Sequence, residues 1–303
     1  MPDTHAIIMA GGAASRLMPH SAGRPKALFP MGSRILLDFA LDFTSGLSSV
    51  SVTTNTASRE AVKNQLRNLA HVSTWSDRIS AGTWPSLLQH SSKILRWNGS
   101  DDLVVCSADH VISGLSLTDA LNHHQTLGAP VTVIVVPAKS YGVFYRVENS
   151  AITAWSAKPR PEMHSSTGIY IFSVGYIQEI IRRFFSPSRG RLVASSVNAA
   201  AVQPAVESSL AVAYSAADCY WDDAGTLQRF HANNMRLSGG ANVAHYGVTS
   251  TDWDIIKRCV VVGTADISPK NPINNSVISV GPGQQLRTTT LYYGRQTSTG
   301  LMG

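Results

Sequence analysis

Near the amino terminus, glycines and two cations follow a short apolar run and could bind an anion. The run at 6–10 ends in Gly11 and Gly12, and the cations are Arg16 and Lys26. An apolar run that breaks into small residues predicts a strand entering a tight turn. Glycines let main-chain N–H groups approach a ligand, and several such groups around one concavity bind anions. We therefore predict a site for a triphosphate; the alternative is a strand end with two solvated cations.

A carboxylate that follows a buried strand is a second candidate for chemistry. Residues 103–106 form an apolar run typical of a central strand, so Asp109 falls at the carboxyl end of that strand. Ligands of open α/β sheets bind at the carboxyl ends of strands, and carboxylate oxygens suit Mg²⁺, a hard cation. The sequence therefore offers Asp109 as a metal ligand, with a helix N-cap or loop aspartate as the alternative.

Strands and helices alternate along the chain and would position these residues. Residues 34–46 carry apolar side chains at helical spacing, 49–54 alternates like a strand, and 58–69 has a second amphipathic pattern. Strand, helix, strand and helix in succession imply parallel βαβ units. The same patterns predict two more helices and one more strand: 115–127, 174–185 and 131–136.

The composition is that of an ordinary globular protein. Of 303 residues, 44% are hydrophobic and 15% are charged, and the net charge is +6. This basic balance suits polyanionic ligands, but no block of five Lys or Arg is present, so we expect no nucleic-acid partner. The three cysteines form no Cys-x-x-Cys pair, which argues against a zinc ribbon or a disulfide framework. Without a secretory leader or an apolar run of about 20 residues, a cytoplasmic protein with no membrane partner is expected.

The loop string resembles the signature of sugar-1-phosphate nucleotidylyltransferases. Its residues are Ala-Gly-Gly-Ala-Ala-Ser-Arg-Leu at 10–17 and Arg-Pro-Lys at 24–26. It has neither the Gly-Lys-Ser/Thr of a Walker A loop nor the glycine spacing of the dinucleotide fingerprint. The resemblance implies a Rossmann-like α/β domain with a mixed, partly parallel sheet. It also implies nucleotide contacts from the loop and its cations: Ala10, Gly11, Gly12, Ala13, Arg16 and Lys26. One departure is Ala14, where the family has its third glycine.

Two later segments resemble the ADP-glucose pyrophosphorylase branch of that family. They are Tyr-Trp-Asp-Asp-Ala-Gly-Thr-Leu at 220–227 and Ser-Thr-Gly-Ile-Tyr at 166–170. In the first, Asp223 matches the family's second metal carboxylate. The resemblance therefore implies a Mg²⁺ ion held by Asp109 and Asp223.

Shorter matches mark the nucleoside and acceptor sides of the expected site. Gly82 and Thr83 match a Gly-Thr pair that lies against the nucleoside, and Trp84 beside them would either stack on a base or pack in the core. The resemblance implies three acceptor-binding residues: Gly142, Lys158 and Ser166. Ala157 replaces the family's glutamate, which holds sugar hydroxyls.

Together these matches imply transfer of a nucleoside monophosphate from ATP or GTP to a sugar 1-phosphate, giving a nucleotide sugar and pyrophosphate. Positioning and electrostatic stabilisation can carry such a transfer without a covalent nucleophile. Because Ala157 cannot accept hydrogen bonds from sugar hydroxyls as a glutamate would, we expect either reduced activity or a different acceptor, such as a sugar-like cyclitol 1-phosphate of the valienol type. The alternative is a non-catalytic regulatory paralogue that binds nucleotide or sugar phosphate. A homodimer or homotetramer is expected. The catalytic residues would be Arg16, Lys26, Asp109, Lys158 and Asp223.

The carboxyl-terminal segment loses the helical pattern. Val261, Ile267 and Ile273 recur every six residues, a period typical of a left-handed parallel β-helix. We therefore expect a catalytic domain at 1–238 and a short left-handed β-helix stub at 239–303, with an irregular tail as the alternative.

Overall fold

The computed structural model divides the chain into two compact units. It describes residues 3–12, 14–18, 20, 25–78, 82–186, 194–244, 256–262, 272–280 and 286–290. The first unit comprises Met1–Ala14, Gly23–Leu28 and Ile35–Asp223, and the second comprises Ser15–Ala22, Phe29–Arg34 and Ala224–Gly303. The units interleave in sequence, and a functional boundary at residue 238 stays a prediction. Within the described ranges, none of the helices has the length and apolar character needed to cross a membrane.

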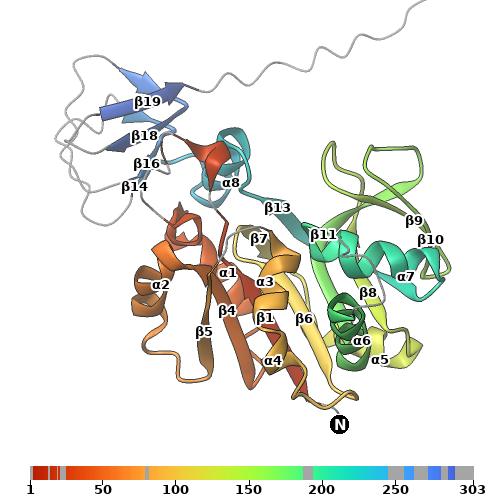
Figure 1. Cartoon of the computed structure of the whole chain (residues 1–303). Helices are drawn as coiled ribbons and strands as arrows, with labels where there is room; N and C mark the ends of the chain where they lie inside the picture. Colours follow the sequence, from red (N-terminus) through yellow and green to blue (C-terminus); the bar gives the residue numbers. More distant parts are fainter. Residues whose placement is uncertain are drawn as a thin grey trace, which may run out of the picture. The chain divides into compact units, whose positions relative to one another are not determined.

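A nine-stranded mixed sheet forms the centre of the first unit (Figure 1). In spatial order its strands are β5 (Val72–Asp77), β4 (Ser49–Asn55), β1 (Thr4–Met9), β6 (Asp102–Ser107), β11 (Met163–Ser173), β8 (Val131–Val136), β12 (Ala211–Ser215), β10 (Ala151–Ser156) and β9 (Phe144–Glu148). Strands β5, β4, β1 and β6 are parallel, whereas β11 runs antiparallel to β6 and β8. The predicted α/β fold with a mixed sheet is confirmed.

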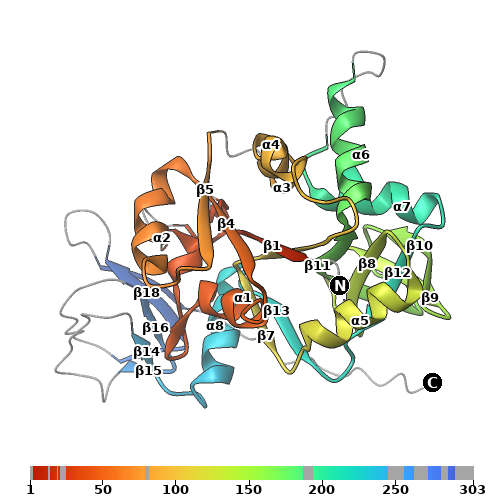
Figure 2. The ribbon, with the colours of Figure 1, turned by 90° about the horizontal axis from the view of Figure 1, so that it is seen from below.

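Helices cover both faces of this sheet because side chains alternate along its strands. In β1, Ile7 faces one side and Ile8 the other. The first face packs against α3 (Thr83–Gln89), α4 (Ser91–Ile94), α6 (Val174–Phe185), the π-helix η4 (Asn198–Val202) and α7 (Gln203–Glu207). The second packs against α1 (Leu36–Phe43), α2 (Arg59–Leu66), which follows η3 (Thr56–Ser58), and α5 (Leu117–Leu127). Figure 2 shows α3, α4 and α6 on one side of β1 and α1 and α5 on the other.

The predicted elements have the expected type and slightly different ends. The strands expected at 49–54 and 131–136 are β4 and β8, and α6 has the predicted bounds. Helix α1 begins later than expected because residues 34–35 form β3 (Arg34–Ile35), which pairs with β2 (Pro30–Met31). The N–H of Ile35 donates to Asp38 Oδ2 at 3.1 Å, which caps the start of α1.

The strand order changes direction at β1. This strand pairs in parallel with β4 on one side and β6 on the other, so Met9 lies in register with Thr53 and Ser107. The carboxyl ends of neighbouring parallel strands therefore form one edge, which we call the carboxyl edge. In open α/β sheets, ligands bind at such a switch point.

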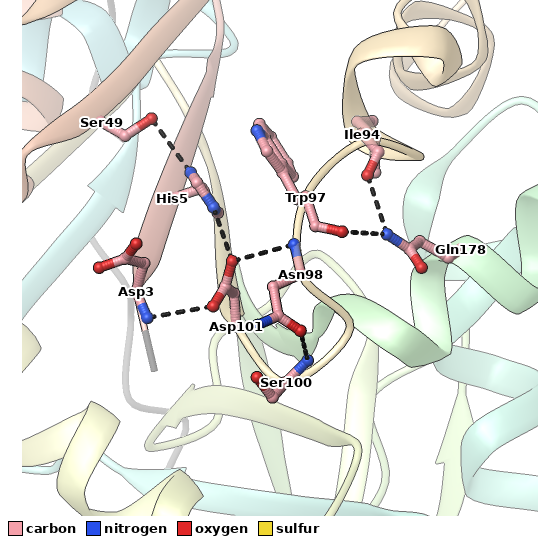
Figure 3. Close-up of polar contacts among 9 residues, drawn as sticks. All are labelled: Asp3, His5, Ser49, Ile94, Trp97, Asn98, Ser100, Asp101 and Gln178. Carbon is pink, nitrogen blue, oxygen red and sulfur yellow. Dashed lines mark hydrogen bonds and ion pairs between the residues drawn. The ribbon is translucent and has the colours of Figure 1, made fainter. Parts of the chain in front are cut away.

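At the opposite, amino-terminal ends of β1, β4 and β6, four side chains form a cluster that we call the amino-edge network (Figure 3). Its members are His5, Ser49, Trp97 and Asp101. His5 Nδ1 lies 3.1 Å from Ser49 Oγ and its Nε2 lies 3.3 Å from Asp101 Oδ2. Its ring stacks on Trp97 with 4.1 Å between ring centroids. Asp101 also accepts hydrogen bonds from the N–H groups of Asp3 and Asn98, both at 3.2 Å. This cluster joins three strands at their starts.

In the second unit, α8 (Leu227–Leu237) holds the segment around β2. Thr226 caps the helix by accepting the N–H of Arg229 at 3.3 Å. The Asn234 side chain donates to the Pro30 carbonyl at 3.2 Å and accepts the N–H of Gly32 at 2.9 Å. An amide that uses both ends in this way fixes the path of the short β2 segment.

The rest of the second unit stacks short parallel strands at a regular interval. They are β14 (Val243–Ala244), β16 (Val260–Val262) and β18 (Ser276–Val280) in one sheet, with β15 (Ile256–Lys257) and β17 (Ile273–Asn274) in another. Val243 pairs with Val260 and Val260 with Val277, equal steps of 17 residues. Strand β19 (Leu286–Thr290) pairs antiparallel with β18. Stacked coils would give this spacing, but the left-handed β-helix stays a prediction, and Ile267 lies outside the described residues.

Candidate active site

A cavity of about 320 Å³ opens at the carboxyl edge of the large sheet. Its walls come from the ends of four neighbouring strands, β5, β4, β1 and β6, from the loop after β1, from η2 (Lys26–Leu28) and from the start of α3. The lining residues are Met9, Ala10, Gly11, Gly12, Lys26, Ala27, Thr53, Asp77, Gly82, Thr83, Ser86, Ser107, Ala108 and Asp109. The structure thus brings together seven residues that the sequence had predicted: Ala10, Gly11, Gly12, Lys26, Gly82, Thr83 and Asp109.

The glycine loop after β1 is held close to β4 and β5. The N–H of Ala10 donates to the Thr53 carbonyl at 2.8 Å, and Asn55 Nδ2 donates to the Gly11 carbonyl at 3.2 Å. A Cβ atom at Gly11 would lie 3.2 Å from Asp77 Oδ2 and 3.5 Å from the Asn55 nitrogen, so a larger residue would crowd this approach. A glycine at position 11 thus fits without displacing Asp77, whose carboxylate would have to shift slightly for a larger residue.

Ala14 adopts the backbone conformation that its place in the loop demands. Its φ is +51°, in the left-handed region that glycine enters without steric cost. An alanine there is strained, because Cβ approaches the following carbonyl oxygen. The departure from the resembled signature therefore leaves the loop in a glycine-like conformation. Ala13, the neighbouring predicted contact, lies outside the described residues.

Lys26 and Asp109 form an ion pair at the wall of the cavity. Lys26 Nζ donates a hydrogen bond to Asp109 Oδ2, and the exposed fractions of the two side chains are 11% and 31%. Burial by itself would raise the pKa of Asp109, but the charge of Lys26 and the hydrogen bond from Lys26 outweigh burial and hold the pKa below its usual value. Asp109 is therefore a carboxylate at neutral pH.

Asp223 reaches the same edge through a short antiparallel pair. Strand β7 (His110–Ser113) pairs with β13 (Tyr220–Asp223), and this register places Asp223 opposite His110, the residue next to Asp109. Burial lowers the pKa of His110 below its usual value, although the carboxylates of Asp109 and Asp223 act in the opposite direction. The imidazole is therefore neutral at pH 7, and His110 packs edge-on against Trp221 with 5.4 Å between ring centroids.

Asp222, next to Asp223 in the same segment, has an anchoring role. Its Oδ1 accepts hydrogen bonds from the Tyr141 hydroxyl and, at 2.8 Å, from the N–H of Asp223. A carboxylate that accepts its neighbour's N–H fixes the backbone at that point. Asp222 thereby orients the strand end that carries Asp223.

The carboxylate oxygens of Asp109 and Asp223 are suitable ligands for a hard cation such as Mg²⁺. Among the residues that the structure describes, no group of three or more His, Cys, Asp or Glu side chains could hold a metal. An ion held by these two carboxylates would therefore take its other ligands from water and substrate phosphate, which is the usual coordination of protein-bound Mg²⁺. The donor set fits the predicted ion.

Gly82 and Thr83 line the cavity and are also needed for packing. Gly82 has φ +113°, and a Cβ atom there would lie 2.0 Å from the Ser195 carbonyl oxygen, which excludes any larger residue. The Thr83 hydroxyl accepts the N–H of Val197 at 3.0 Å. Trp84 is fully buried in the core and packs edge-on against Phe184, and it does not line the cavity. Of its two expected roles, packing is the one observed.

The three predicted acceptor residues are not among the residues that line this cavity. Ser166 N–H donates to the Val143 carbonyl at 2.8 Å, and Ser166 Oγ accepts the N–H of Gly168 at 3.1 Å. Gly142 has φ +103°, and a Cβ atom there would lie 4.0 Å from the Ser166 carbonyl oxygen, so these two residues are neighbours. Lys158 is exposed in the turn after β10, and its N–H donates to Ser156 Oγ at 3.1 Å. Their part in acceptor binding stays a prediction.

Arg16 belongs to the second unit. It is an exposed residue of η1 (Ser15–Leu17), a single 3-10 turn. Its predicted contact with the phosphates of a nucleotide stays a prediction.

Asp77 and Ser86 are two of the cavity residues that the sequence analysis did not predict. Asp77 is the last residue of β5, is 4% exposed, and has Oδ1 2.9 Å from His90 Nε2. Ser86 is 5% exposed in α3, and its Oγ has no hydrogen-bond partner among the described residues. A correct prediction of β5 would have placed Asp77 at the carboxyl edge beside Asp109. Ser86 carries no signal in the sequence alone.

Comparison with known proteins bears on the reaction. A family model described as nucleotidyl transferase matches residues 5–239. The chain is 28% identical over 283 residues to glucose-1-phosphate adenylyltransferase 2 of Vibrio parahaemolyticus, covering 78% of this chain and 67% of that protein. It is 27% identical over 295 residues to glucose-1-phosphate adenylyltransferase of Nitrosococcus oceani, covering 84% and 67%.

Two solved structures share the fold at low sequence identity. One, described as a putative glucose-1-phosphate thymidylyltransferase from Bacillus anthracis, has a TM-score of 0.64 and 18% identity, covering 78% of this chain and 95% of that one. The other, described as mannose-1-phosphate geranyltransferase from Thermus thermophilus, has a TM-score of 0.67 and 17% identity, covering 95% of each chain. At such identities the likeness establishes the fold alone.

Proposed function

Since the chain belongs to the nucleotidyl transferase family, we propose that it transfers a nucleoside monophosphate from ATP or GTP to a sugar 1-phosphate or a sugar-like cyclitol 1-phosphate. The products are pyrophosphate and a nucleotide sugar or pseudo-sugar. The observation that carries the proposal is the Lys26–Asp109 pair beside the glycine loop, at the switch point of the sheet. The relatives named as glucose-1-phosphate adenylyltransferases support a sugar 1-phosphate as acceptor.

In this proposal the cavity holds the triphosphate by its charge and its main-chain donors. The loop at Gly11 and Gly12 binds the outer phosphates, and Lys26 stabilises the charge that develops on the α-phosphate and on the leaving pyrophosphate. In the free protein Lys26 is paired with Asp109, so a bound phosphate would share its ammonium group with that carboxylate. Asp109 and Asp223 would hold a Mg²⁺ ion, which when bound neutralises phosphate charge.

In this proposal the acceptor sugar or cyclitol phosphate is bound by residues that do not line the cavity. Lys158 holds the acceptor phosphate for in-line attack, Gly142 leaves room for the ring, and Ser166 lies next to Gly142. Ala157 stands in the place of a hydroxyl-binding glutamate in the resembled signature, and therefore we propose a cyclitol 1-phosphate of the valienol type as the preferred acceptor. The working enzyme would be a cytoplasmic homodimer or homotetramer.

Release of pyrophosphate across a grid of substrates tests this function. Four nucleoside triphosphates are combined with hexose and cyclitol 1-phosphates in the presence of Mg²⁺, for the wild type, Asp109→Ala and the control Asp218→Ala, an exposed aspartate before β13. A productive pair that is silenced by Asp109→Ala and unaffected by Asp218→Ala is expected. Efficient use of glucose 1-phosphate with no turnover of any cyclitol phosphate would contradict the acceptor. Nucleotide binding with no release from any pair would instead favour the regulatory paralogue.

A further inference from the structure

Among the described residues that line the cavity, the cation Lys26 lies at one side, paired with Asp109, and the carboxylate Asp77 lies at another. Lys26 lies with Asp109 near the ends of β1 and β6, whereas Asp77 lies at the end of β5, two strands from β1 in the sheet. A buried carboxylate repels phosphate, and an ammonium group attracts it. A nucleoside triphosphate in this cavity would therefore place its phosphates towards Lys26 and its uncharged nucleoside towards Asp77.

One carboxylate oxygen of Asp77 is hydrogen-bonded to His90, and the other faces the glycine loop. Oδ1 lies 2.9 Å from His90 Nε2, and the His90 ring lies 4.9 Å from the Trp75 ring between centroids. The main-chain carbonyl of Asp77 accepts the Thr56 hydroxyl at 3.0 Å. Oδ2 faces the glycine loop, 3.2 Å from the place that a Cβ atom of Gly11 would occupy, and no donor in the described part of the chain reaches it. This oxygen can accept a hydrogen bond from a ligand.

Ser86 supplies a second polar group that the protein leaves unused. It lines the same cavity, and its buried Oγ makes no hydrogen bond within the described residues. Buried hydroxyl groups in folded proteins almost always have a partner. Because nothing in the described chain holds this hydroxyl, it can rotate about χ1 to serve a group bound in the cavity.

From these two side chains we infer that the cavity selects a nucleotide whose base bears an exocyclic amino group, and this inference rests on the proposed function. Asp77 Oδ2 accepts from the amino group of adenine, guanine or cytosine, and Ser86 bonds a neighbouring ring nitrogen or carbonyl group. Uracil and thymine present a single N–H donor flanked by two carbonyl oxygens, and a carboxylate that accepts from this N–H is repelled by both oxygens, so these bases bind less tightly. Asp77 and Ser86 are therefore specificity-determining residues for the donor nucleotide.

Calorimetric titration of the whole protein with ATP, GTP, CTP, UTP and inorganic tripolyphosphate, with Mg²⁺ present, tests the inference. The wild type is expected to bind at least one amino-bearing nucleotide roughly tenfold more tightly than UTP, since a hydrogen bond to a charged group has about that value. Asp77→Asn keeps an acceptor for His90 but adds a donor, so it should reduce this ratio to about twofold or less. Ser86→Ala should weaken the preferred nucleotide roughly fivefold. Neither change should alter binding of tripolyphosphate, which has no base.

Matched controls separate base recognition from a general effect on folding. Asp101→Asn alters another buried carboxylate that is hydrogen-bonded to a histidine, outside the cavity, and Ser91→Ala alters a serine of α4 outside the cavity. Both should leave the base preference unchanged. If Asp77→Asn weakens the binding of ribonucleotides but not of 2′-deoxy nucleotides, Asp77 binds the ribose hydroxyl and the inference is wrong. A wild type that binds UTP as tightly as the other three also overturns it, even if no variant folds. No binding of any nucleotide would instead contradict the proposed function.

Discussion

The two ends of the parallel strands both carry a buried carboxylate beside a histidine, but they differ in how many partners the protein supplies. In the amino-edge network, Asp101 has donors on both oxygens: the N–H of Asp3 on one, and His5 and the N–H of Asn98 on the other. At the carboxyl edge, Asp77 is held by His90 through a single oxygen. An aspartate beside a histidine thus has a structural role at the amino edge, where both carboxylate oxygens have donors. At the carboxyl edge, one oxygen of Asp77 has no donor among the described residues and can bind a ligand.

The largest effect should come from removing the cation of the carboxyl edge. Lys26→Ala deletes the ammonium group that pairs with Asp109, and its loss is expected to lower the rate of pyrophosphate release at least about a hundredfold, as for other groups that stabilise transition-state charge. The exposed Lys63 of α2 provides the control, since Lys63→Ala should leave the rate unchanged. A loss below tenfold in a folded Lys26→Ala protein would mean that this edge does not carry the reaction.

Disrupting the amino-edge network should instead reduce stability and spare the site. Asp101→Ala leaves His5 and two main-chain N–H groups without their acceptor, and about 2–3 kcal/mol of unfolding free energy should be lost. Urea unfolding measures the loss, and nucleotide titration of the folded variant should give wild-type affinities. Altered affinity at conditions where the variant is fully folded would show that the two edges are coupled.

Much of the fold could be predicted because strongly apolar elements carry a clear period. The run at 131–136 is fully buried as β8, and α6 has the amphipathic spacing that its sequence shows. Strand β5 was missed because Val72–Asp77 is an edge strand with mixed exposure, in which serine and threonine weaken the apolar alternation. The second unit was harder still, since its strands are short and repeat every 17 residues.

The sequence analysis found those site residues that either follow a predicted strand or belong to a recognisable motif. Asp109 follows a buried strand and Lys26 lies in a motif, and both line the cavity. Asp77 was missed because its strand was missed, and no local pattern marks Ser86, whose importance lies in the partner that it lacks. Hydrogen-bond completeness is a property of the folded chain, so it cannot be seen in sequence spacing.

A smaller effect is expected on the pH dependence of stability, and it comes from Asp102 at the start of β6. Burial alone would raise the pKa of Asp102, but hydrogen bonds from His124 and Gln125 outweigh it, and the pKa lies below its usual value. The ionised group thus adds stability above about pH 4, which is lost as the pH falls through the folded pKa. Asp102→Asn should therefore show a flatter fall in melting temperature below pH 4. Parallel wild-type and variant curves between pH 6 and pH 3 would contradict this.

The smallest expected effect is at the strained residue of the loop. Ala14→Gly removes the Cβ atom that opposes φ +51°, while glycine adds freedom to the unfolded chain, so a net gain of about 0.5 kcal/mol is expected. Urea unfolding of the wild type and the variant measures it. A loss of stability would show that the unfolded-state entropy of glycine exceeds the strain that it relieves.

Photolabelling with 8-azido-ATP and 8-azido-GTP would most directly test whether the carboxyl edge binds the nucleotide. The azido group sits on the base, so covalent label is expected in the peptide that contains Asp77 and Ser86, with protection by the unmodified nucleotide. Label that is protected by nucleotide but lies only on peptides outside the cavity, such as α5 or the amino-edge network, would contradict a nucleotide site at the carboxyl ends of β1, β4, β5 and β6.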